Sequence, residues 1–286
     1  MLLIRLCLAA SALLLTACAS APPPAPDLRV SGNRLFIAAE INGQPIEALL
    51  DSGAEMTLLD AAAAARLGLG TAGSADVRGS GAATEEVTFA EGLQTRAAGI
   101  TLENQMAAVL DLTDISARVV GEPVAAILGR EIFDAARFYL DIETGAFRTA
   151  NDTTLDGAVR LPLTDAMGIK QVPVRIEGQP ESLADFDLGN GSRVLISEAF
   201  ARRAGLLEPA RITGTESGGG IGGAVTRQLV TLETLEIAGQ TLRNVEAAID
   251  PSPDAPDANV GVSVLRRFDM LIDFPGGAVW LRPRAG

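Results

Sequence analysis

The chain contains 286 residues, of which 48% are hydrophobic, and its formal net charge is −13. This length suits one or two domains with buried cores, and an acidic chain without a basic patch is not expected to bind nucleic acid. With no histidine, and with cysteine only at Cys7 and Cys18, the body of the protein lacks histidine-dependent triads, cysteine nucleophiles and the usual zinc ligands, so any hydrolysis must use carboxylates, hydroxyls, lysines or a carboxylate-bound metal.

The first 18 residues have the features of a bacterial export signal. Arg5 precedes a short apolar stretch, and the segment ends in Leu15-Thr16-Ala17-Cys18. The stretch is too short for a transmembrane helix, and its ending resembles a lipobox, whose cysteine is lipidated and becomes the mature N-terminus. We therefore expect residues 1–18 to be a lipoprotein signal peptide with Cys18 as the lipidation site. Ordinary secretion is the alternative, because Ala17-Cys18-Ala19 also fits a cleavage site.

Residues 19–29 are rich in proline and include Pro22-Pro23-Pro24. Proline favours an extended, semi-rigid linker, which would hold a folded body away from a membrane. We predict a periplasm-facing lipoprotein of the cell envelope, attached to the membrane through its N-terminal lipid. Ala19-Ser20 lacks an aspartate retention signal, which favours the outer membrane over the inner one; a secreted periplasmic protein is the alternative.

The next segment predicts two strands that lead to an Asp-Ser-Gly sequence. Residues 35–60 read LFIAAEINGQPIEALLDSGAEMTLLD, with a Gly-Gln-Pro turn before a second strand that ends at Asp51-Ser52-Gly53. An alanine-rich stretch at 61–67 predicts a short helix with Asp60 as its N-cap. A glycine-rich stretch around Gly79-Ser80-Gly81 lies between alternating segments and predicts a β-hairpin.

The first half ends in a short apolar element and a strand. Residues 126–129 read AILG, and a short helix is expected at 130–136. The strand that follows contains Tyr139, which we expect in the core, and ends at Asp141, which we expect to be a turn or cap residue. The polar residues 151–154 predict a connector.

The second half repeats these elements in the same order. The stretch from Val172 reads VPVRIEGQPESLADFDLGNGSRVLIS, and its second strand ends at Asp187-Leu188-Gly189. Further copies of the helices, the glycine-rich hairpin, the short apolar element and the strand-ending aspartate are found at residues 197–204, 213–223, 259–261, 263–268 and 273. A repeat of this length predicts two similar lobes. We assign residues 30–150 to an N-terminal lobe and residues 160–284 to a C-terminal lobe.

Two of the repeated elements resemble those of a known family. Residues 48–54, ALLDSGA, resemble the active-site sequence of retropepsin-like and pepsin-like aspartic proteases, and Ile127-Leu128-Gly129 resembles the hydrophobic-hydrophobic-glycine element that follows it there. The resemblance implies a mainly β fold, in which two homologous barrel-like lobes with short helices surround a central cleft. It implies that Asp51 and Asp187 are the catalytic pair. The active-site loops would then contain Ser52, Gly53, Ala54, Leu188, Gly189 and Asn190, and two hairpin flaps would cover the cleft with Gly79, Ser80, Gly81, Gly218, Gly219 and Gly220.

Such a site needs only two carboxylates and water. Like charges held close together cannot both ionise, so the pair shares one proton. The ionised carboxylate then acts as base on a water molecule, and the protonated one donates to the scissile carbonyl oxygen. The resemblance therefore implies an aspartic endopeptidase without cofactor or metal, which acts on an extended peptide or protein and works as a monomer rather than a dimer.

The second motif departs from the family pattern, because Leu188 stands where threonine or serine is expected. Leu188 cannot make a hydroxyl hydrogen bond across the lobe interface, a loss of about 1 kcal/mol; a backbone group, water or Asn190 could bind Ser52 instead. Three outcomes are compatible: a working dyad, a remnant second lobe with two chains pairing their first lobes, or a cleft that binds peptides without cutting them. The last, a catalytically impaired peptide-binding envelope lipoprotein, is the main alternative function.

Other acidic residues offer further hypotheses. Asp185 lies near Asp187, but the register of the repeat places Asp187 opposite Asp51 because Gly189 matches Gly53. A carboxylate-metal hydrolase could use residues 250–257, DPSPDAPD, whose spacing does not fit a calcium loop; a solvated proline-rich loop is the preferred interpretation.

Overall fold

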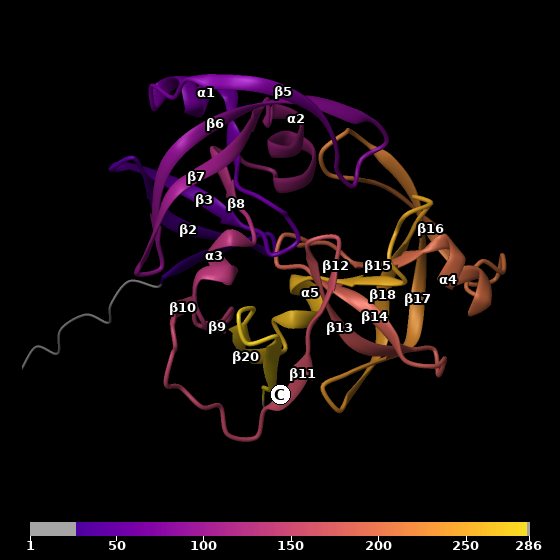
Figure 1. Ribbon diagram of the computed structural model, residues 1–286. Helices are drawn as coiled ribbons and strands as arrows, with labels where there is room; N and C mark the ends of the chain where they lie inside the picture. Colours follow the sequence, from indigo (N-terminus) through magenta and orange to yellow (C-terminus); the bar gives the residue numbers. More distant parts are fainter. Residues whose placement is uncertain (1–26, 285–286) are drawn as a thin grey trace, which may run out of the picture.

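The computed structural model describes residues 27–284. Cys18, the signal peptide and most of the proline-rich linker lie outside the described residues. The described part is built from two eight-stranded sheets, one from each half of the chain, and a five-stranded sheet to which both halves contribute (Figure 1).

The N-terminal sheet curls towards a closed ring. Its strand order is β1-β2-β3-β8-β4-β7-β6-β5, and β2 also pairs with β6. Its strands are β1 (Leu28–Ser31), β2 (Arg34–Ile41), β3 (Gln44–Leu50), β4 (Leu58–Asp60), β5 (Thr71–Arg78), β6 (Thr84–Ala97), β7 (Ile100–Leu110) and β8 (Ala126–Leu128).

The C-terminal sheet has the same topology. Its order is β12-β13-β14-β19-β15-β18-β17-β16, with β13 also paired to β17. Its strands are β12 (Thr164–Ala166), β13 (Ile169–Ile176), β14 (Ser182–Phe186), β15 (Val194–Ser197), β16 (Ile212–Gly218), β17 (Val225–Ile237), β18 (Gln240–Asp250) and β19 (Ala258–Val260). The repeat seen in the sequence is therefore a repeat of strand order.

The third sheet joins the two halves, with the order β10-β9-β20-β21-β11. Its strands are β9 (Phe138–Asp141), β10 (Ala146–Thr149), β11 (Val159–Pro162), β20 (Phe268–Asp273) and β21 (Ala278–Pro283). The central pair β9–β20 contains one strand from each half. Strands assigned from the sequence to two separate lobes thus lie in one shared sheet, seen around the C-terminus in Figure 1.

The helices are short, and two of them start after a residue whose side chain caps them. Asp60 accepts from the backbone N–H groups of Ala62 and Ala63 at the start of α1 (Ala61–Arg66), and Ser197 accepts from that of Phe200 at the start of α4 (Glu198–Arg203). α3 (Glu131–Ala135) and α5 (Val262–Leu265) follow the glycines after β8 and β19. The sequence predicted these four helices, but not α2 (Thr113–Ile115) and the π-helical turn η1 (Ser116–Val120). Within residues 27–284, no helix is both long enough and apolar enough to cross a membrane.

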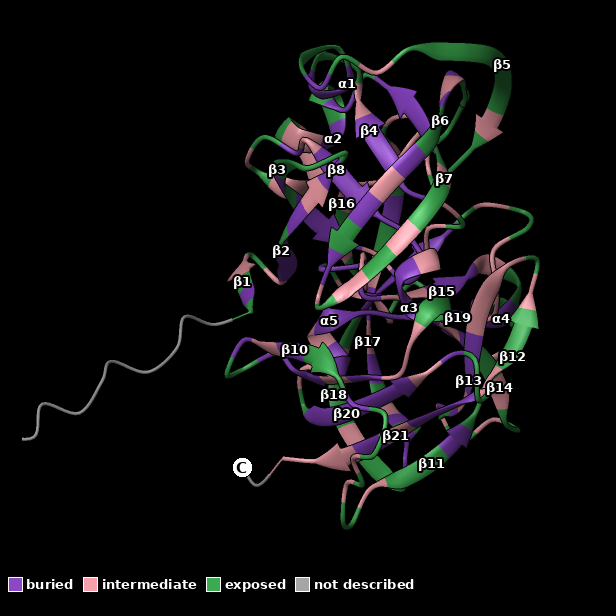
Figure 2. Ribbon diagram, turned by 60° about the vertical axis from the view of Figure 1, so that its left-hand side comes forward, coloured by how far each residue is buried: buried purple, intermediate pink, exposed green. Residues whose placement is uncertain are grey.

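The core of each lobe is mostly aliphatic, and aromatic side chains gather where the lobes join. Phe133, Phe138, Phe147 and Phe274 pack around one another beneath the shared sheet, with ring centroids of contacting pairs 4.7–6.1 Å apart. Figure 2 shows the central strands mostly buried, whereas β5 is mostly exposed at the edge of the molecule. Four of the nine phenylalanines of the chain thus stabilise the junction of the two halves.

Candidate active site

Each aspartate of the repeated motif directly follows a strand that is held by the short apolar element. Asp51 follows β3, which runs parallel to β8, and its N–H donates to the carbonyl oxygen of Leu128 at 2.9 Å. Asp187 follows β14, which runs parallel to β19, and its N–H donates to the carbonyl oxygen of Val260 at 3.1 Å. The apolar elements therefore fix the starting point of both loops.

The two carboxyl groups meet where the lobes touch. A Cβ atom added to Gly189 would lie 2.2 Å from Cγ of Asp51, and one added to Gly53 would lie 2.8 Å from Cγ of Asp187. Each carboxyl group thus packs on the backbone of the opposite loop, in space that only glycine leaves free. Asp185, in contrast, accepts a hydrogen bond from the side chain of Gln171 at 2.8 Å, so Asp187 is the aspartate that faces Asp51.

Ser52 joins the two loops through backbone groups. Its buried hydroxyl donates to the carbonyl oxygen of Phe186 at 2.7 Å and accepts from the N–H of Leu188 at 2.9 Å. Of the possibilities left open by the sequence, a backbone partner for Ser52 is the one observed. Leu188 is fully buried, and it replaces a second hydroxyl by an apolar contact.

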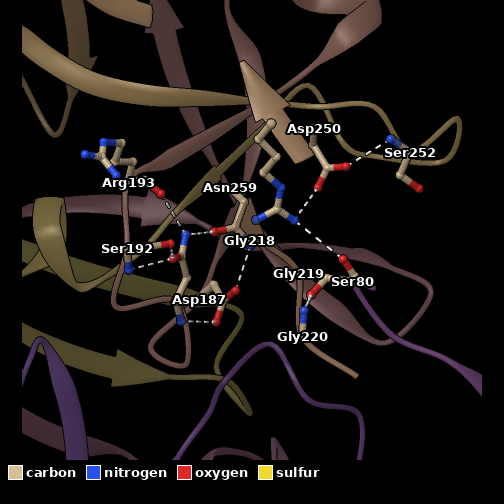
Figure 3. Close-up of polar contacts among 12 residues, drawn as sticks. Ser80, Asp187, Ser192, Arg193, Gly218, Gly219, Gly220, Asp250, Ser252 and Asn259 are labelled. Carbon is tan, nitrogen blue, oxygen red and sulfur yellow. Dashed lines mark hydrogen bonds and ion pairs between the residues drawn. The ribbon is translucent and has the colours of Figure 1, made fainter. Parts of the chain in front are cut away.

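The two carboxyl groups differ in their hydrogen bonds. Asp51 accepts one, from the N–H of Gly53 at 2.8 Å. Asp187 accepts three, from the N–H groups of Gly189 and Asn190 at 2.9 and 3.0 Å and from the side-chain amide of Asn259 at 2.7 Å. Figure 3 shows the bond from Asn259. N–H donors favour the ionised form of a carboxyl group, so Asp51, with a single N–H donor, is the member of the pair suited to hold the proton.

The protonation of Asp51 agrees with that assignment. Burial, followed by the neighbouring charge of Asp187, raises the pKa of Asp51 to about 8, although the hydrogen bond from Gly53 and the charge of Arg34 oppose this rise. Asp51 therefore holds a proton at neutral pH.

Asn259 was not recognised as a site residue from the sequence. It stands where the first lobe has Ile127, and it links Asp187 to the loop behind it, because Asn190 donates to Asn259 Oδ1 at 2.8 Å. Asn190 itself does not contact Ser52; it also donates to the carbonyl oxygen of Arg193 and accepts from Ser192. A polar residue inside an otherwise apolar repeated element was the available signal.

Arg34 is a second residue that sequence reasoning missed. This buried side chain begins β2, and its guanidinium donates to the carbonyl oxygens of Gly189 and Val119. Burial lowers the pKa of Arg34, whereas the charges of Asp187 and Asp51 raise it. Arg34 thus places a positive charge behind the carboxyl pair. The sequence feature that could have indicated Arg34 was an arginine at the start of an otherwise apolar strand.

The two glycine-rich stretches form hairpins whose tips meet. The N–H of Gly81 donates to the carbonyl oxygen of Ile221 at 2.8 Å, and that of Ala83 donates to the carbonyl oxygen of Gly222 at 2.8 Å. The N–H of Gly220 donates to the hydroxyl of Ser80 at 2.9 Å (Figure 3). We call the β5–β6 hairpin the N-terminal flap and the β16–β17 hairpin the C-terminal flap.

The predicted flap glycines lie where backbones approach closely. A Cβ on Gly79 would lie 2.7 Å from Cβ of Ile221, and one on Gly81 would lie 2.3 Å from the carbonyl carbon of Gly222. Gly218, Gly219 and Gly220 have contacts equally close, with Arg227, Gly223 and Ser80. Gly79, Gly81 and Gly220 therefore allow the flaps to pack on each other, whereas Gly218 and Gly219 allow close packing within the C-terminal flap.

A pocket of about 340 Å³ lies beneath the tip of the N-terminal flap; neither Asp51 nor Asp187 lines it, but Asn259, which donates to Asp187, does. Ser80 and Asn259 line it, together with Asp185, whose pKa is raised to about 6 mainly by burial. Asp250, the first residue of the acidic loop, also lines the pocket, but it forms a buried ion pair with Arg227 at 3.1 Å. Within residues 27–284, no group of three acidic, histidine or cysteine side chains has the arrangement of a metal site.

The remaining predicted residues have structural contacts. Asp141 accepts from the N–H groups of Glu143 and Thr144, and Asp273 from that of Gly276, so both cap turns. The prediction of Tyr139 as a core residue is wrong. Its ring lies half-buried on the outer face of the shared sheet, under the guanidinium of Arg148 at 4.5 Å, because its neighbours Phe138 and Leu140 fill the inner face of the same alternating strand.

Comparison with known proteins gives one family for both lobes. A family described as aspartyl protease matches residues 37–132 and 172–264, which contain both aspartates and both apolar elements. Among curated proteins, the chain is 49% identical over 45 residues to DNA damage-inducible protein 1 of Eremothecium gossypii. That match covers 16% of this chain and 10% of the relative, so the chain matches about a tenth of the relative's length.

Two solved structures resemble this chain, one over most of its length and the other over less than half of it. Basic 7S globulin from soybean superimposes with a TM-score of 0.53 at 9% identity, over 91% of this chain and 94% of that one. A retropepsin-like aspartic protease from Rickettsia conorii gives a TM-score of 0.36 at 18% identity, over 44% of this chain and 89% of that one. The likeness to the globulin is one of fold, and it confirms the predicted mainly β, two-lobed architecture.

Proposed function

Because the chain belongs to the aspartyl protease family, we propose that it is an endopeptidase that hydrolyses peptide bonds with the pair Asp51 and Asp187. The observation that carries the proposal is the mutual packing of each carboxyl group on the opposite loop's glycine. This packing supports a complete dyad within one chain, and therefore a monomeric enzyme.

The hydrogen bonds give the two carboxyl groups separate roles. Asp187, with three N–H donors, is the base that takes a proton from the attacking water, while Asp51 donates its proton to the scissile carbonyl oxygen. Water oxygen bonds to the carbonyl carbon to give a diol. The diol collapses as its carbon–nitrogen bond breaks: the proton now on Asp187 passes to the leaving nitrogen, and one diol hydroxyl returns a proton to Asp51, which leaves a carboxylic acid and an amine. Since the pKa of Asp51 is about 8, the singly protonated pair persists through neutral pH.

The substrate in this proposal is an extended peptide or unfolded protein segment. It would lie between the two flaps and the carboxyl pair, and the pocket lined by Ser80 and Asn259 would receive one of its side chains. The flap backbones offer N–H and carbonyl groups to an extended chain, which supports recognition that depends little on sequence.

A second candidate function is peptide binding without cleavage. It is favoured by Leu188, which leaves only Ser52 to join the active-site loops through a hydroxyl. Binding would use the same flaps and pocket.

The test compares the full-length wild type with Asp51→Asn and with Asp152→Asn, an exposed connector aspartate. Each is incubated with an unfolded protein from mildly acidic to neutral pH, and new peptide ends are identified by mass spectrometry. We expect cleavage by wild type and Asp152→Asn, and a loss of at least about a thousandfold in Asp51→Asn. A wild type that binds peptide but cuts nothing would contradict the endopeptidase and support the binding protein.

We also propose that the chain is a lipoprotein of the cell envelope, on the basis of Leu15-Thr16-Ala17-Cys18. The mass of the mature N-terminal peptide tests this. A diacylglyceryl group on Cys18, absent after Cys18→Ala, is the expected result; an unmodified peptide that begins after Ala17 or Ala19 would contradict it.

A further inference from the structure

Arg118 extends from the N-terminal lobe to the flap of the C-terminal lobe. It lies in η1, the π-helical turn between β7 and β8. Its guanidinium donates to the carbonyl oxygens of three consecutive residues at the flap tip, Gly218 at 2.9 Å, Gly219 at 2.7 Å and Gly220 at 3.1 Å. One cation therefore binds the backbone of the opposite lobe at three points.

Asp114 holds this guanidinium in place from behind. Nε of Arg118 donates to both carboxylate oxygens of Asp114, at 3.2 and 3.1 Å, and one terminal nitrogen donates at 2.6 Å. The Arg118 side chain is 18% exposed and that of Asp114 is 61% exposed. The carboxylate thus orients the planar fork from the solvent side, while the other edge of the fork faces the flap.

The glycines of the C-terminal flap make this contact possible. Gly219 has a φ of +90°, a conformation that favours glycine, and a Cβ there would lie 2.5 Å from the carbonyl oxygen of Gly223. At Gly218 a Cβ would lie 2.6 Å from a guanidinium nitrogen of Arg227. The backbone can therefore turn sharply enough for three neighbouring carbonyl groups to meet one guanidinium.

The opposite side of the cleft is built differently. In the C-terminal lobe, β18 is followed by residues 251–257, PSPDAPD, which contain no arginine. The tip of the N-terminal flap is bonded instead to the C-terminal flap, through Gly81, Ala83 and Ser80. Hence the C-terminal flap is bonded to the body of the opposite lobe, whereas the N-terminal flap is bonded to the other flap.

We propose that Arg118 is a positioning residue that latches the C-terminal flap, so that this flap is a fixed wall of the cleft and the N-terminal flap opens to admit peptide. The proposal rests on the proposed function in taking the cleft as the place where peptide enters. The three charged hydrogen bonds from Arg118, at 2.7–3.1 Å, resist opening more strongly than the bonds between the flap tips. Among those tip bonds, the charged one from Arg227 to the carbonyl oxygen of Ser80 is long, at 3.5 Å, and the bonds of Gly81, Ala83 and Gly220 are neutral. Opening the N-terminal flap breaks only the bonds at the tips.

Amide hydrogen exchange of the full-length chain in detergent micelles tests the latch without requiring catalysis. The variants are Arg118→Met and a matched control, Arg202→Met, which removes another i,i+4 arginine–carboxylate pair that lies in α4 and forms no hydrogen bond with either flap. In the wild type we expect residues 79–83 to exchange faster than residues 218–224. In Arg118→Met, exchange at residues 218–224 should rise by at least about tenfold, while Arg202→Met should match the wild type there.

Two results would overturn the latch: unchanged exchange at residues 218–224 in Arg118→Met, or a wild-type N-terminal flap that exchanges more slowly than the C-terminal one. Exchange in β20 and β21 reports the fold in every variant. If exchange in β20 and β21 also rises in Arg118→Met, the milder variant Arg118→Gln is measured instead. Faster exchange confined to residues 218–224 in Arg118→Gln would support the latch, and wild-type exchange there would refute it.

Peptidase kinetics supply a second readout, which depends on the proposed function. We expect Arg118→Met to raise KM several-fold and to change kcat little, since no bond of Asp51 or Asp187 is altered. A fall in kcat at constant KM would refute a role confined to the flap. If the wild type cleaves nothing, the proposed function fails, while the exchange experiment still decides the latch.

Discussion

Ser52 and Leu188 occupy matching positions in the two active-site loops, but of these two only Ser52 forms hydrogen bonds across the interface with its side chain. Its hydroxyl both donates and accepts, so it satisfies two buried backbone groups, the carbonyl of Phe186 and the N–H of Leu188. The side chain of Leu188 forms no such hydrogen bond but contributes buried apolar surface at the matching position. One hydroxyl is therefore sufficient to join the loops, and the missing second hydroxyl does not separate the carboxyl groups.

Replacing Ser52 tests this joint. Ser52→Ala leaves two buried backbone groups without partners, which should lower the free energy of unfolding by about 1–3 kcal/mol. Because the loops carry the carboxyl pair, kcat should also fall, by about 10- to 100-fold. Ser52→Thr keeps the hydroxyl and should retain the wild-type free energy of unfolding and the wild-type kcat. Urea unfolding and peptidase assays measure the effects, and a Ser52→Ala variant equal to wild type in both would refute the role.

The proton on Asp51 makes a prediction about stability. The pKa of Asp51 is about 8 in the folded chain, against an ordinary value of 3.8. Between these values the folded state binds a proton that the unfolded state has released, so the free energy of unfolding falls as pH rises from about 4 to 8. Asp51→Asn removes this loss and should be about 2–5 kcal/mol more stable than wild type at pH 8 but nearly equal at pH 4.

Urea unfolding of wild type and Asp51→Asn at pH 4, 6 and 8 measures that difference. Asp152→Asn controls for the loss of a negative charge and should follow the wild type. A constant difference between Asp51→Asn and wild type at all three pH values would contradict a protonated, buried Asp51.

At the scale of elements, local signals predicted most of the strands and helices. The Gly-Gln-Pro turns, the alternating strands and the cap at Asp60 all act within a few residues. The segment that forms α2 and η1 was missed, because residues 113–120 contain no complete helical turn of apolar residues, although Asp111 accepts a hydrogen bond from the N–H of Thr113 at the start of α2. Its conformation depends on contacts made at a distance, among them that of Arg118 with the opposite flap.

The contact between the flap tips can be tested with a pair of glycines. Gly222 and Gly239 both have positive φ, at +92° and +72°, but only at Gly222 would a Cβ collide with another group, the carbonyl oxygen of Ala83 at 2.0 Å. Both alanine variants should lose about 1 kcal/mol of stability from backbone strain. Only Gly222→Ala should raise KM, several-fold, because it alone separates the flaps. Equal KM values for the two variants would contradict a functional flap contact.

At the scale of the molecule, the repeat predicted two lobes but not the sheet that joins them. The strands that end each half pair with each other, since each would otherwise be an exposed edge. Arg284 strengthens the junction by donating to Asp141 of the first half and Asp269 of the second. A repeat in a single sequence reveals equivalent elements, but it does not say whether they pair within a half or across the two halves.

The same limit applies to the site. The register of the repeat predicted Asp51 and Asp187, because each is defined by its own local motif. Asn259, Arg34 and Arg118 have no motif of their own, and their contacts arise only when the lobes or neighbouring strands come together. Residues that act across an interface are thus the ones that single-sequence reasoning leaves out.

The most direct test of a dyad within one chain is the specific activity of wild type and Asp187→Asn over a dilution series. Asp187 is the proposed base, so Asp187→Asn should lose at least about a thousandfold in kcat, and wild-type specific activity should not depend on concentration. If Asp187→Asn stayed active and its specific activity rose with concentration, the first lobes of two chains would form the site. That result would contradict the single-chain dyad.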